Sequence, residues 1–268
     1  MLKQRLISAA LMLLIFIGCF FLLPNIFFEI LVMLISATLF YELRTLLNIS
    51  GRQSLFYWLF SLASLVPVFA YNDDLKAFGV FFALLACLFW LVLVPFKMQM
   101  GLRQPSFLKH SYFLYGFILI TPMLYSVLIL FNENKPLLLF VFIVIWIADI
   151  AAYFTGKRFG TIQIASHISP GKTLEGVLGG IVFNIIFVIL IKLNFDQFDL
   201  VSGLIFCIFI SALSVYGDLF ESLLKRLAGV KDSNNIIPGH GGFLDRVDGF
   251  LPSLPFAFIY FQYVSLTV

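Results

Sequence analysis

The chain has 268 residues, of which 62% are hydrophobic and only 12% are charged, and its formal net charge is +3. A soluble globular domain is about 45–50% apolar, so this composition excludes an ordinary water-soluble fold. Apolar runs of roughly 20 residues predict transmembrane helices, whereas the alternating pattern of a transmembrane β-barrel is absent. The three cysteines lie apart in apolar runs, which excludes a disulfide framework and a Cys/His zinc site.

Nine apolar segments follow one another, and turn-forming residues separate them. Lys3 and Arg5 precede the first segment. We interpret that segment as a retained span and not as a cleaved signal peptide, because it lacks a small-residue cleavage site and another span follows at once. The sequence therefore predicts an all-α polytopic membrane protein with about nine transmembrane helices, near residues 6–23, 26–46, 55–71, 76–95, 110–131, 136–155, 174–193, 199–219 and 249–266.

Basic residues are distributed unevenly over the two sides that nine spans define. Fourteen of the 17 Lys and Arg residues fall on the side of the N-terminus and of the loops after even-numbered spans, and the other side holds Lys76, Lys135 and Lys192. The positive-inside rule then predicts a cytoplasmic N-terminus and an outside C-terminus. A basic cytoplasmic face suits anionic lipid headgroups and nucleotide phosphates.

The chain divides into two predicted regions. An N-terminal transmembrane region, 1–134, holds five spans, and a C-terminal transmembrane catalytic region, 135–268, holds four. The second region carries two long cytoplasmic loops, 156–173 and 220–248, which share one side of the membrane and so can meet. These loops and the span ends beside them carry the residues that indicate chemistry.

The first loop leads into Ser169-Pro170-Gly171-Lys172-Thr173-Leu174-Glu175-Gly176. This sequence predicts a helix start that Thr173 or Ser169 caps, and a helix N-terminus beside Lys172 is an anion site. It is not a P-loop, because Ser166 stands where that motif needs its first glycine and no strand precedes it. Upstream, Asp149 is a carboxylate inside a predicted span.

The second loop and the end of the span before it hold the densest charge in the chain. Charge beside lipid is costly, so a mixed cluster at a span end indicates chemistry. Mg²⁺ takes one or two carboxylates together with substrate phosphates, and Lys and Arg are the usual phosphate ligands. The nine charged residues of this segment are Asp218, Glu221, Lys225, Arg226, Lys231, Asp232, Asp245, Arg246 and Asp248.

Other interpretations stay open for these residues. The acids could pair with neighbouring cations in solvated salt bridges, Asp149 could be a polar packing contact, and the basic side chains could extend from helix ends into water. Gly239-His240-Gly241-Gly242 gives a loop whose backbone N–H groups can approach phosphate. Metal-assisted phosphoryl or nucleotidyl transfer at the membrane surface is the chemistry that these residues support.

At these positions the chain resembles the phosphatidate cytidylyltransferase (CDP-diacylglycerol synthase) family. The family signature is matched at Ser222, Lys225-Arg226, Lys231-Asp232, Pro238-Gly239-His240-Gly241-Gly242 and Asp245-Arg246-Val247-Asp248. The element from Ser169 to Gly176 resembles the family too, although Gly171 stands where lysine is frequent.

The resemblance implies a nucleotidyltransferase of phospholipid biosynthesis that converts CTP and phosphatidic acid into CDP-diacylglycerol and pyrophosphate. It implies Mg²⁺, with a second monovalent or divalent cation, and a homodimer among membrane lipids, with no nucleic-acid partner. The cytoplasmic active site follows from the charge distribution, and the compact length favours a bacterial inner membrane.

The resemblance also implies roles for individual residues. The predicted catalytic residues are Asp218, Asp245, Lys225, Arg226, Lys231 and Asp248. The predicted substrate-binding residues are Ser169, Lys172, Thr173, Glu175, Ser222, Asp232, His240, Gly241, Gly242 and Arg246. The predicted metal ligands are Asp218 and Asp245, with Asp248 and Asp149 assisting.

Two other functions are compatible with a polytopic protein that carries this cluster. A CTP-dependent polyprenol or lipid kinase would transfer the γ-phosphate and release CDP. A membrane transporter would place its charged site near the bilayer midplane, often between two related halves. Here the charges gather at one end of the C-terminal half and no internal repeat is present, which disfavours a transporter. The complete run from Lys231-Asp232 to Asp245-Arg246-Val247-Asp248 favours the cytidylyltransferase over the kinase.

Overall fold

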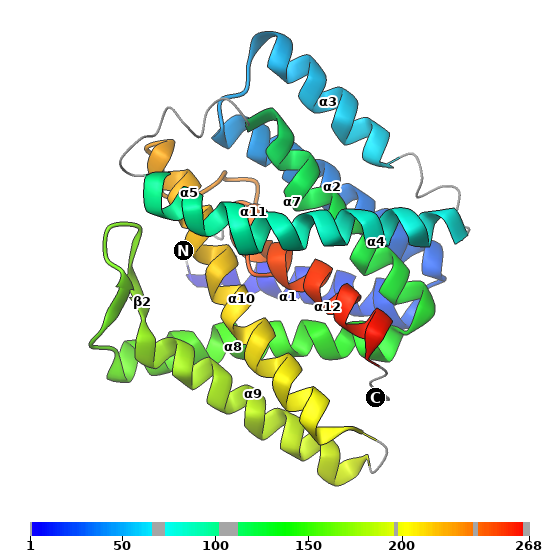
Figure 1. The fold of residues 1–268 in the computed structure, drawn as a ribbon, viewed down its shortest axis with the longest axis vertical. Helices are drawn as coiled ribbons and strands as arrows, with labels where there is room; N and C mark the ends of the chain where they lie inside the picture. Colours follow the sequence, from blue (N-terminus) through cyan, green and yellow to red (C-terminus); the bar gives the residue numbers. More distant parts are fainter. Residues whose placement is uncertain (1, 66–72, 102–111, 196–197, 238–240, 265–268) are drawn as a thin grey trace.

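The computed structural model describes residues 2–65, 73–101, 112–195, 198–237 and 241–264 (Figure 1). Helices make up most of these residues, and one two-stranded antiparallel sheet, β1 Gln163–Ala165 with β2 Ser169–Thr173, forms a hairpin. The α-helices are α1 Leu2–Ile17, α2 Asn25–Leu46, α3 Gly51–Leu65, α4 Asp73–Leu88, α5 Val94–Gly101, α7 Tyr112–Glu133, α8 Lys135–Phe159, α9 Leu174–Asn194, α10 Leu200–Leu227, α11 Leu244–Val247 and α12 Phe250–Tyr263. Among the described residues, two π-helical segments continue helices: η1 Gly18–Leu22 follows α1, and η3 Phe89–Leu93 joins α4 to α5.

Six of the described helices are long and apolar enough to cross a membrane, and an integral membrane protein built from helices is therefore confirmed. These spans are Asn25–Leu46, Lys76–Gln99, Leu114–Glu133, Lys135–Phe159, Leu174–Asn194 and Leu200–Leu227. The segments predicted at 6–23, 55–71 and 249–266 also contain helices, which fall below that length or hydropathy. Nine spans and the orientation of the termini stay predictions. Residues 66–71, 110–111 and 265–266 of the predicted spans lie outside the described residues.

Side chains cap the starts of the helices that lead to the site. Asn134 accepts a hydrogen bond from Leu137 N at 3.0 Å and begins α8. Thr173 accepts one from Gly176 N at 3.2 Å and begins α9, so the predicted Thr173 cap is confirmed. Each cap satisfies a backbone donor that the first turn of a helix leaves without a partner.

Helix α7 is the central helix, and α2, α3, α4 and α12 pack around it. Helices α8 and α9 lie against each other with their backbones almost in contact. A Cβ added at Gly176 would come 2.9 Å from the carbonyl oxygen of Ala152, and one added at Gly180 would come 2.9 Å from that of Ala148. In Figure 1, α3 lies on one outer edge of the molecule and α9 on the other. Because α12 packs against α4 and α7, the two predicted sequence regions share one core.

Long-range contacts bring three connecting segments to the same end of the bundle, which we call the loop end. Arg226 at the end of α10 donates to Ile168 O in the hairpin at 3.1 Å. Leu244 N donates to Glu42 near the end of α2 at 2.8 Å. At the opposite end, Lys76 and Glu133 form an ion pair at 2.9 Å. The two long loops therefore meet, as the sequence predicts.

The predicted loops 156–173 and 220–248 are more structured than expected. Helix α8 continues to Phe159, α10 continues to Leu227, and the hairpin occupies most of the remaining first loop. The cause is that the polar residues after each apolar run are still good helix formers, so α10 ends only near Gly229, whose φ is +73°. Lys225 therefore lies on a helix and not in a flexible loop.

Candidate active site

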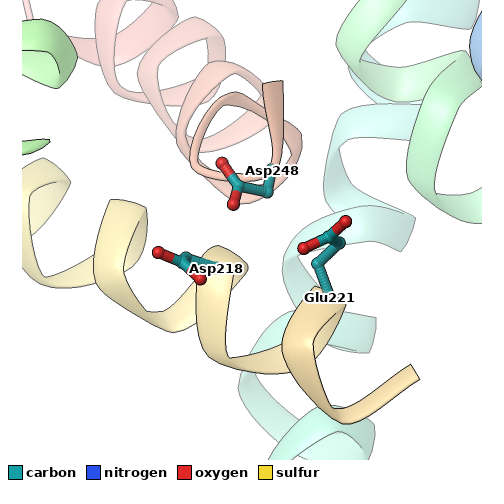
Figure 2. Close-up of side chains that lie close together, drawn as sticks. All are labelled: Asp218, Glu221 and Asp248. Carbon is teal, nitrogen blue, oxygen red and sulfur yellow. The ribbon is translucent and has the colours of Figure 1, made fainter. Parts of the chain in front are cut away.

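Three carboxylates converge at the loop end of the bundle. Asp218 and Glu221 project from neighbouring turns of α10, and Asp248 faces them from the junction of α11 and α12 (Figure 2). One oxygen of each lies within 4.8 Å of the others. We call this group the carboxylate trio. It joins two helices that are separate in sequence, and Glu221 was not among the predicted metal ligands.

The positive charge around the trio does not balance the negative charge of its carboxylates. Burial and the charges of Asp218 and Asp149 raise the pKa of Asp248 well above its ordinary value. Glu221 is only 2% exposed, and its Oε1 accepts no hydrogen bond from any described residue. Such a group favours a bound cation, because isolated buried negative charge is costly.

Asp149 of α8 extends the acidic group. Ser214 Oγ donates to its Oδ1 at 2.8 Å, and its charge acts on both Asp248 and Lys172. Ser222 Oγ donates to Asp218 Oδ1 at 3.2 Å. The hydroxyls therefore fix two of the carboxylates without neutralising them.

Two lysines border the trio. Lys172 of the hairpin forms an ion pair with Asp218. Burial alone would lower the pKa of Lys172, but Asp218, Asp149 and Asp248 together raise it above the ordinary value. Lys225 Nζ lies 2.5 Å from Glu221 Oε2 and bridges to Asp245 Oδ1 at 2.6 Å. Lys172 and Lys225 therefore place two ammonium groups beside the trio.

The surroundings of Asp245, a predicted metal ligand, differ from those of the trio. Its Oδ2 accepts from Ser233 N, Ser233 Oγ and Gly242 N, each at 3.0 Å. Burial would raise its pKa, but Lys225 and these donors lower it below the ordinary value. Among the described residues the three-carboxylate group contains Glu221 in place of Asp245, so a direct metal contact by Asp245 stays a prediction.

Sequence reasoning missed a second buried carboxylate, Glu42 of α2. It is 0% exposed, and it accepts from Phe243 N at 2.9 Å, Leu244 N at 2.8 Å and Ser233 Oγ at 3.2 Å. A Cβ at Gly242 would come 2.6 Å from Glu42 Oε2, so only glycine fits there. The available signal was a carboxylate inside an apolar run, where charge is costly.

The other predicted substrate-binding residues have varied positions. Glu175 accepts from Ile162 N at 3.2 Å and from Thr161, which ties the hairpin to α9. Ser169 belongs to β2, and Gly241 has a φ of +84°. Exposed side chains are those of Arg226, Lys231, Asp232 and Arg246, whereas His240 lies outside the described residues.

Two cavities have predicted site residues in their walls. One, of about 330 Å³, has apolar walls that include Phe16, Trp146 and Phe250, and Arg246 is the charged residue among its described lining residues. We call it the apolar cavity. The other, of about 440 Å³, lies between α8, the hairpin and the start of α9, and Asp149 and Lys172 are among its lining residues. We call it the hairpin cavity.

Comparison with known proteins gives consistent matches. A family described as "Cytidylyltransferase family" matches residues 3–264. The phosphatidate cytidylyltransferase of Haemophilus influenzae is 45% identical over 136 residues, which are 48% of this chain and 46% of that protein. That of Bacillus subtilis is 44% identical over 117 residues, 43% of this chain and 44% of that protein. These two matches span about half the length of those relatives.

A further match extends over nearly the whole chain. The phosphatidate cytidylyltransferase of Pseudomonas aeruginosa is 30% identical over 263 residues, which are 95% of this chain and 95% of that protein. The similarity therefore includes the N-terminal helices as well as the charged loop end.

Proposed function

This chain belongs to the cytidylyltransferase family, and on that premise we propose that it is a phosphatidate cytidylyltransferase. A phosphate oxygen of phosphatidic acid attacks the α-phosphorus of CTP and forms a new P–O bond. The bond from the α-phosphorus to the oxygen that bridges to the β-phosphorus breaks, and pyrophosphate leaves. The products are CDP-diacylglycerol and pyrophosphate. The observation that carries the proposal is the carboxylate trio, bordered by Lys172 and Lys225.

We propose Mg²⁺ as the cofactor, held by the trio, with Asp149 assisting it or a second cation. The fit rests on three hard oxygen donors close together and on the buried Oε1 of Glu221, which lacks a hydrogen-bond donor among the described residues. When bound, Mg²⁺ neutralises and orients phosphate oxygens.

The side chains of the protein then act by alignment and charge. Lys172 and Lys225 offer ammonium groups to the phosphates beside the trio. The lipid phosphate is itself the nucleophile, so the reaction needs no covalent protein intermediate. Arg246, in the wall of the apolar cavity, offers a cation to the headgroup of a lipid. Positioning and electrostatic stabilisation are the main contributions in phosphoryl-type transfers.

We further propose nine spans, a cytoplasmic loop end and N-terminus, an outside C-terminus, and assembly as a homodimer in a bacterial inner membrane. The support for the orientation is that fourteen of 17 Lys and Arg residues fall on the side of the loop end under this layout. Support for the membrane comes from the bacterial sources of the similar proteins. The homodimer rests on the family resemblance alone.

Turnover of the purified protein in detergent micelles tests the proposal. The reaction contains phosphatidic acid, Mg²⁺ and CTP labelled separately at the α- and γ-phosphates. We expect the α-label in lipid and the γ-label in pyrophosphate. Transfer of the γ-label into lipid would identify a lipid kinase, and a folded protein that moves neither label would favour a transporter.

A further inference from the structure

A groove of about 530 Å³ lies along α8 and α9, which pack side by side at one edge of the molecule (Figure 1). We call it the lateral groove. Its lining residues include Ile147, Ile150, Ala151, Phe154 and Arg158 of α8 and Phe183 of α9. At 3.6 residues per turn, those from α8 share one face of the helix, and Asp149 falls on the opposite face. No residue of the carboxylate trio lines this groove.

The walls of the lateral groove are apolar and open to the outside of the bundle. Ile150, Phe154 and Phe183 are all exposed, so no described segment of the chain covers them. Both α8 and α9 are long and apolar enough to cross a membrane. The exposed face that carries the groove therefore contacts lipid, and the groove is a hollow in that face.

A cation lies at the loop end of the lateral groove. Arg158 belongs to the last turn of α8, and its guanidinium carbon is 6.0 Å from the ring centroid of Phe159, which also lines the groove. Among the described residues, no carboxylate forms an ion pair with Arg158. An arginine at a helix end can extend into water for its own solvation alone. Beside an apolar groove, its guanidinium also suits a lipid phosphate, which it binds through two parallel hydrogen bonds.

The dimensions of the groove fit one leaflet of a bilayer. From Ile147 to Arg158 is about 16 Å along the helix axis, and half of the hydrocarbon core is about 15 Å thick. A phospholipid with its phosphate at Arg158 would lay an acyl chain over Phe154 and Ile150. A second copy of this chain fits less well, because the described lining residues include no Asp or Glu that a symmetric contact could offer to Arg158.

We propose that the lateral groove binds an anionic phospholipid of the surrounding membrane, with its phosphate on Arg158 and an acyl chain along Ile147, Ile150 and Phe154. This lipid is a resident ligand and not the substrate, because the groove lies on the face of α8 opposite Asp149. It contacts α8 and α9 together and so stabilises their pairing. Basic positions between membrane helices are a known form of site for anionic lipids. The inference does not depend on the proposed cytidylyl transfer.

Thermal unfolding in mixed micelles tests this inference without turnover. The purified protein, in a neutral detergent and without CTP, receives phosphatidylglycerol or phosphatidylcholine with the same acyl chains. We expect a melting temperature about 3–5 °C higher in phosphatidylglycerol. Arg158→Gln should remove most of that difference, whereas Arg158→Lys should keep part of it because the charge remains. Ile150→Trp should also remove it, because the larger side chain fills the groove while Arg158 stays in place.

Two further variants are matched controls. Arg52→Gln removes an exposed arginine at the start of α3, and Ile186→Trp enlarges an exposed side chain of α9 that does not line the groove. Both should keep the full difference between the two lipids. Native mass spectrometry, which counts the phosphatidylglycerol molecules that stay bound, should show one fewer in Arg158→Gln and in Ile150→Trp than in the wild type and the controls.

Several results would overturn the inference. Equal stability of the wild type in the two lipids would do so, as would an equal loss in Arg52→Gln, which would indicate general attraction to a charged surface. If Ile150→Trp separated a dimer into monomers while phosphatidylglycerol had no effect, the groove would be an interface between copies. Stabilisation by phosphatidic acid alone would assign the groove to the substrate.

The same experiment distinguishes this inference from the proposed function. Normal transfer of the α-label with no effect of phosphatidylglycerol would refute the lipid site alone. An effect of phosphatidylglycerol that depends on Arg158, in a folded protein that moves no label from CTP, would support the lipid site and refute the proposed function.

Discussion

Two groups of carboxylates at the loop end differ in how their charge is compensated. The trio of Asp218, Glu221 and Asp248 is crowded with like charge, and its cations are two lysines that each bridge to it. Glu42 and Asp245, which we call the loop carboxylates, accept backbone N–H groups from the segment between α10 and α11. The trio has too few cations to balance its negative charge, whereas both loop carboxylates accept hydrogen bonds from backbone N–H groups.

The difference indicates separate tasks for acids that are neighbours in sequence. Asp245 and Asp248 are three residues apart, yet Asp245 holds a loop and Asp248 belongs to the trio. A carboxylate whose oxygens already accept several hydrogen bonds gains less from a metal than one whose burial is uncompensated. We therefore expect substitutions in the trio to remove catalysis and cation binding, and substitutions of the loop carboxylates to weaken the fold around the site.

The largest effect is expected for Asp248→Asn. The substitution keeps the shape of the side chain but removes a negative ligand, so turnover should fall by at least about 10³-fold, which corresponds to about 4 kcal/mol of transition-state stabilisation. The initial rate of α-label transfer measures it. Glu133→Gln, which alters a carboxylate at the opposite end of the bundle, is the control and should keep wild-type activity. An Asp248→Asn enzyme that retained a tenth of the wild-type rate would contradict the role assigned to the trio.

The next effect distinguishes Asp245 from the trio. In Asp245→Asn, an amide group faces the N–H donors of Ser233 and Gly242, and Lys225 loses one of its two carboxylates. We expect a loss of about 3 kcal/mol in stability, seen as a melting temperature lower by about 10 °C. Thermal unfolding followed by tryptophan fluorescence measures it. If the melting temperature were unchanged while Mg²⁺ binding was lost, Asp245 would be a metal ligand, as the sequence predicts.

Much of this architecture could be predicted because hydropathy and turn chemistry act locally. Each predicted span contains a helix, and the cap at Thr173 follows from short-range signals. The two long loops meet because successive loops alternate between the two sides of the membrane. The helix ends were less predictable. Residues such as Glu221 and Lys225 are polar but form helix well, so α10 continues past the apolar run in which its span was placed.

The division of labour among the carboxylates could not be predicted, because it depends on contacts between distant segments. Glu42 is about 200 positions from the backbone groups that it holds, and nothing in its neighbourhood identifies those partners. Glu221 did carry a signal, since it lies three positions after Asp218 and so shares a helix face with it. Glu221 lies outside the family signature, whereas Asp245 lies within it.

A smaller effect is expected for Glu42→Gln. A glutamine offers one acceptor oxygen where the carboxylate offers two, so one of the three hydrogen bonds to Phe243, Leu244 and Ser233 should be lost, at a cost of about 1–2 kcal/mol. The loop also carries Asp245, so kcat should fall several-fold. KM for either substrate should change by a smaller factor than kcat. Steady-state kinetics and thermal unfolding together measure the two effects.

Glu29→Gln is the matched control for this substitution. Glu29 lies near the other end of the same helix, where its carboxylate accepts a hydrogen bond from Asn132 Nδ2 at 3.1 Å. Its variant should change stability slightly and leave kcat as it is. Equal loss of kcat in both variants would mean that α2 acts only through general stability and that Glu42 has no particular role in positioning the loop.

The smallest expected effect is the stabilisation of the folded protein by Mg²⁺. A ligand at tenfold its dissociation constant adds about 1.4 kcal/mol to the stability of the state that binds it, so removing Mg²⁺ with a chelator should lower the wild-type melting temperature by a few degrees. Asp248→Asn should no longer respond to Mg²⁺, because the trio has lost a ligand. Asp245→Asn should still respond, although from a lower starting temperature, because its trio is intact. If the response to Mg²⁺ disappeared in Asp245→Asn and persisted in Asp248→Asn, the roles of the two groups would be reversed. The loop carboxylates would then bind the metal, and the trio would not.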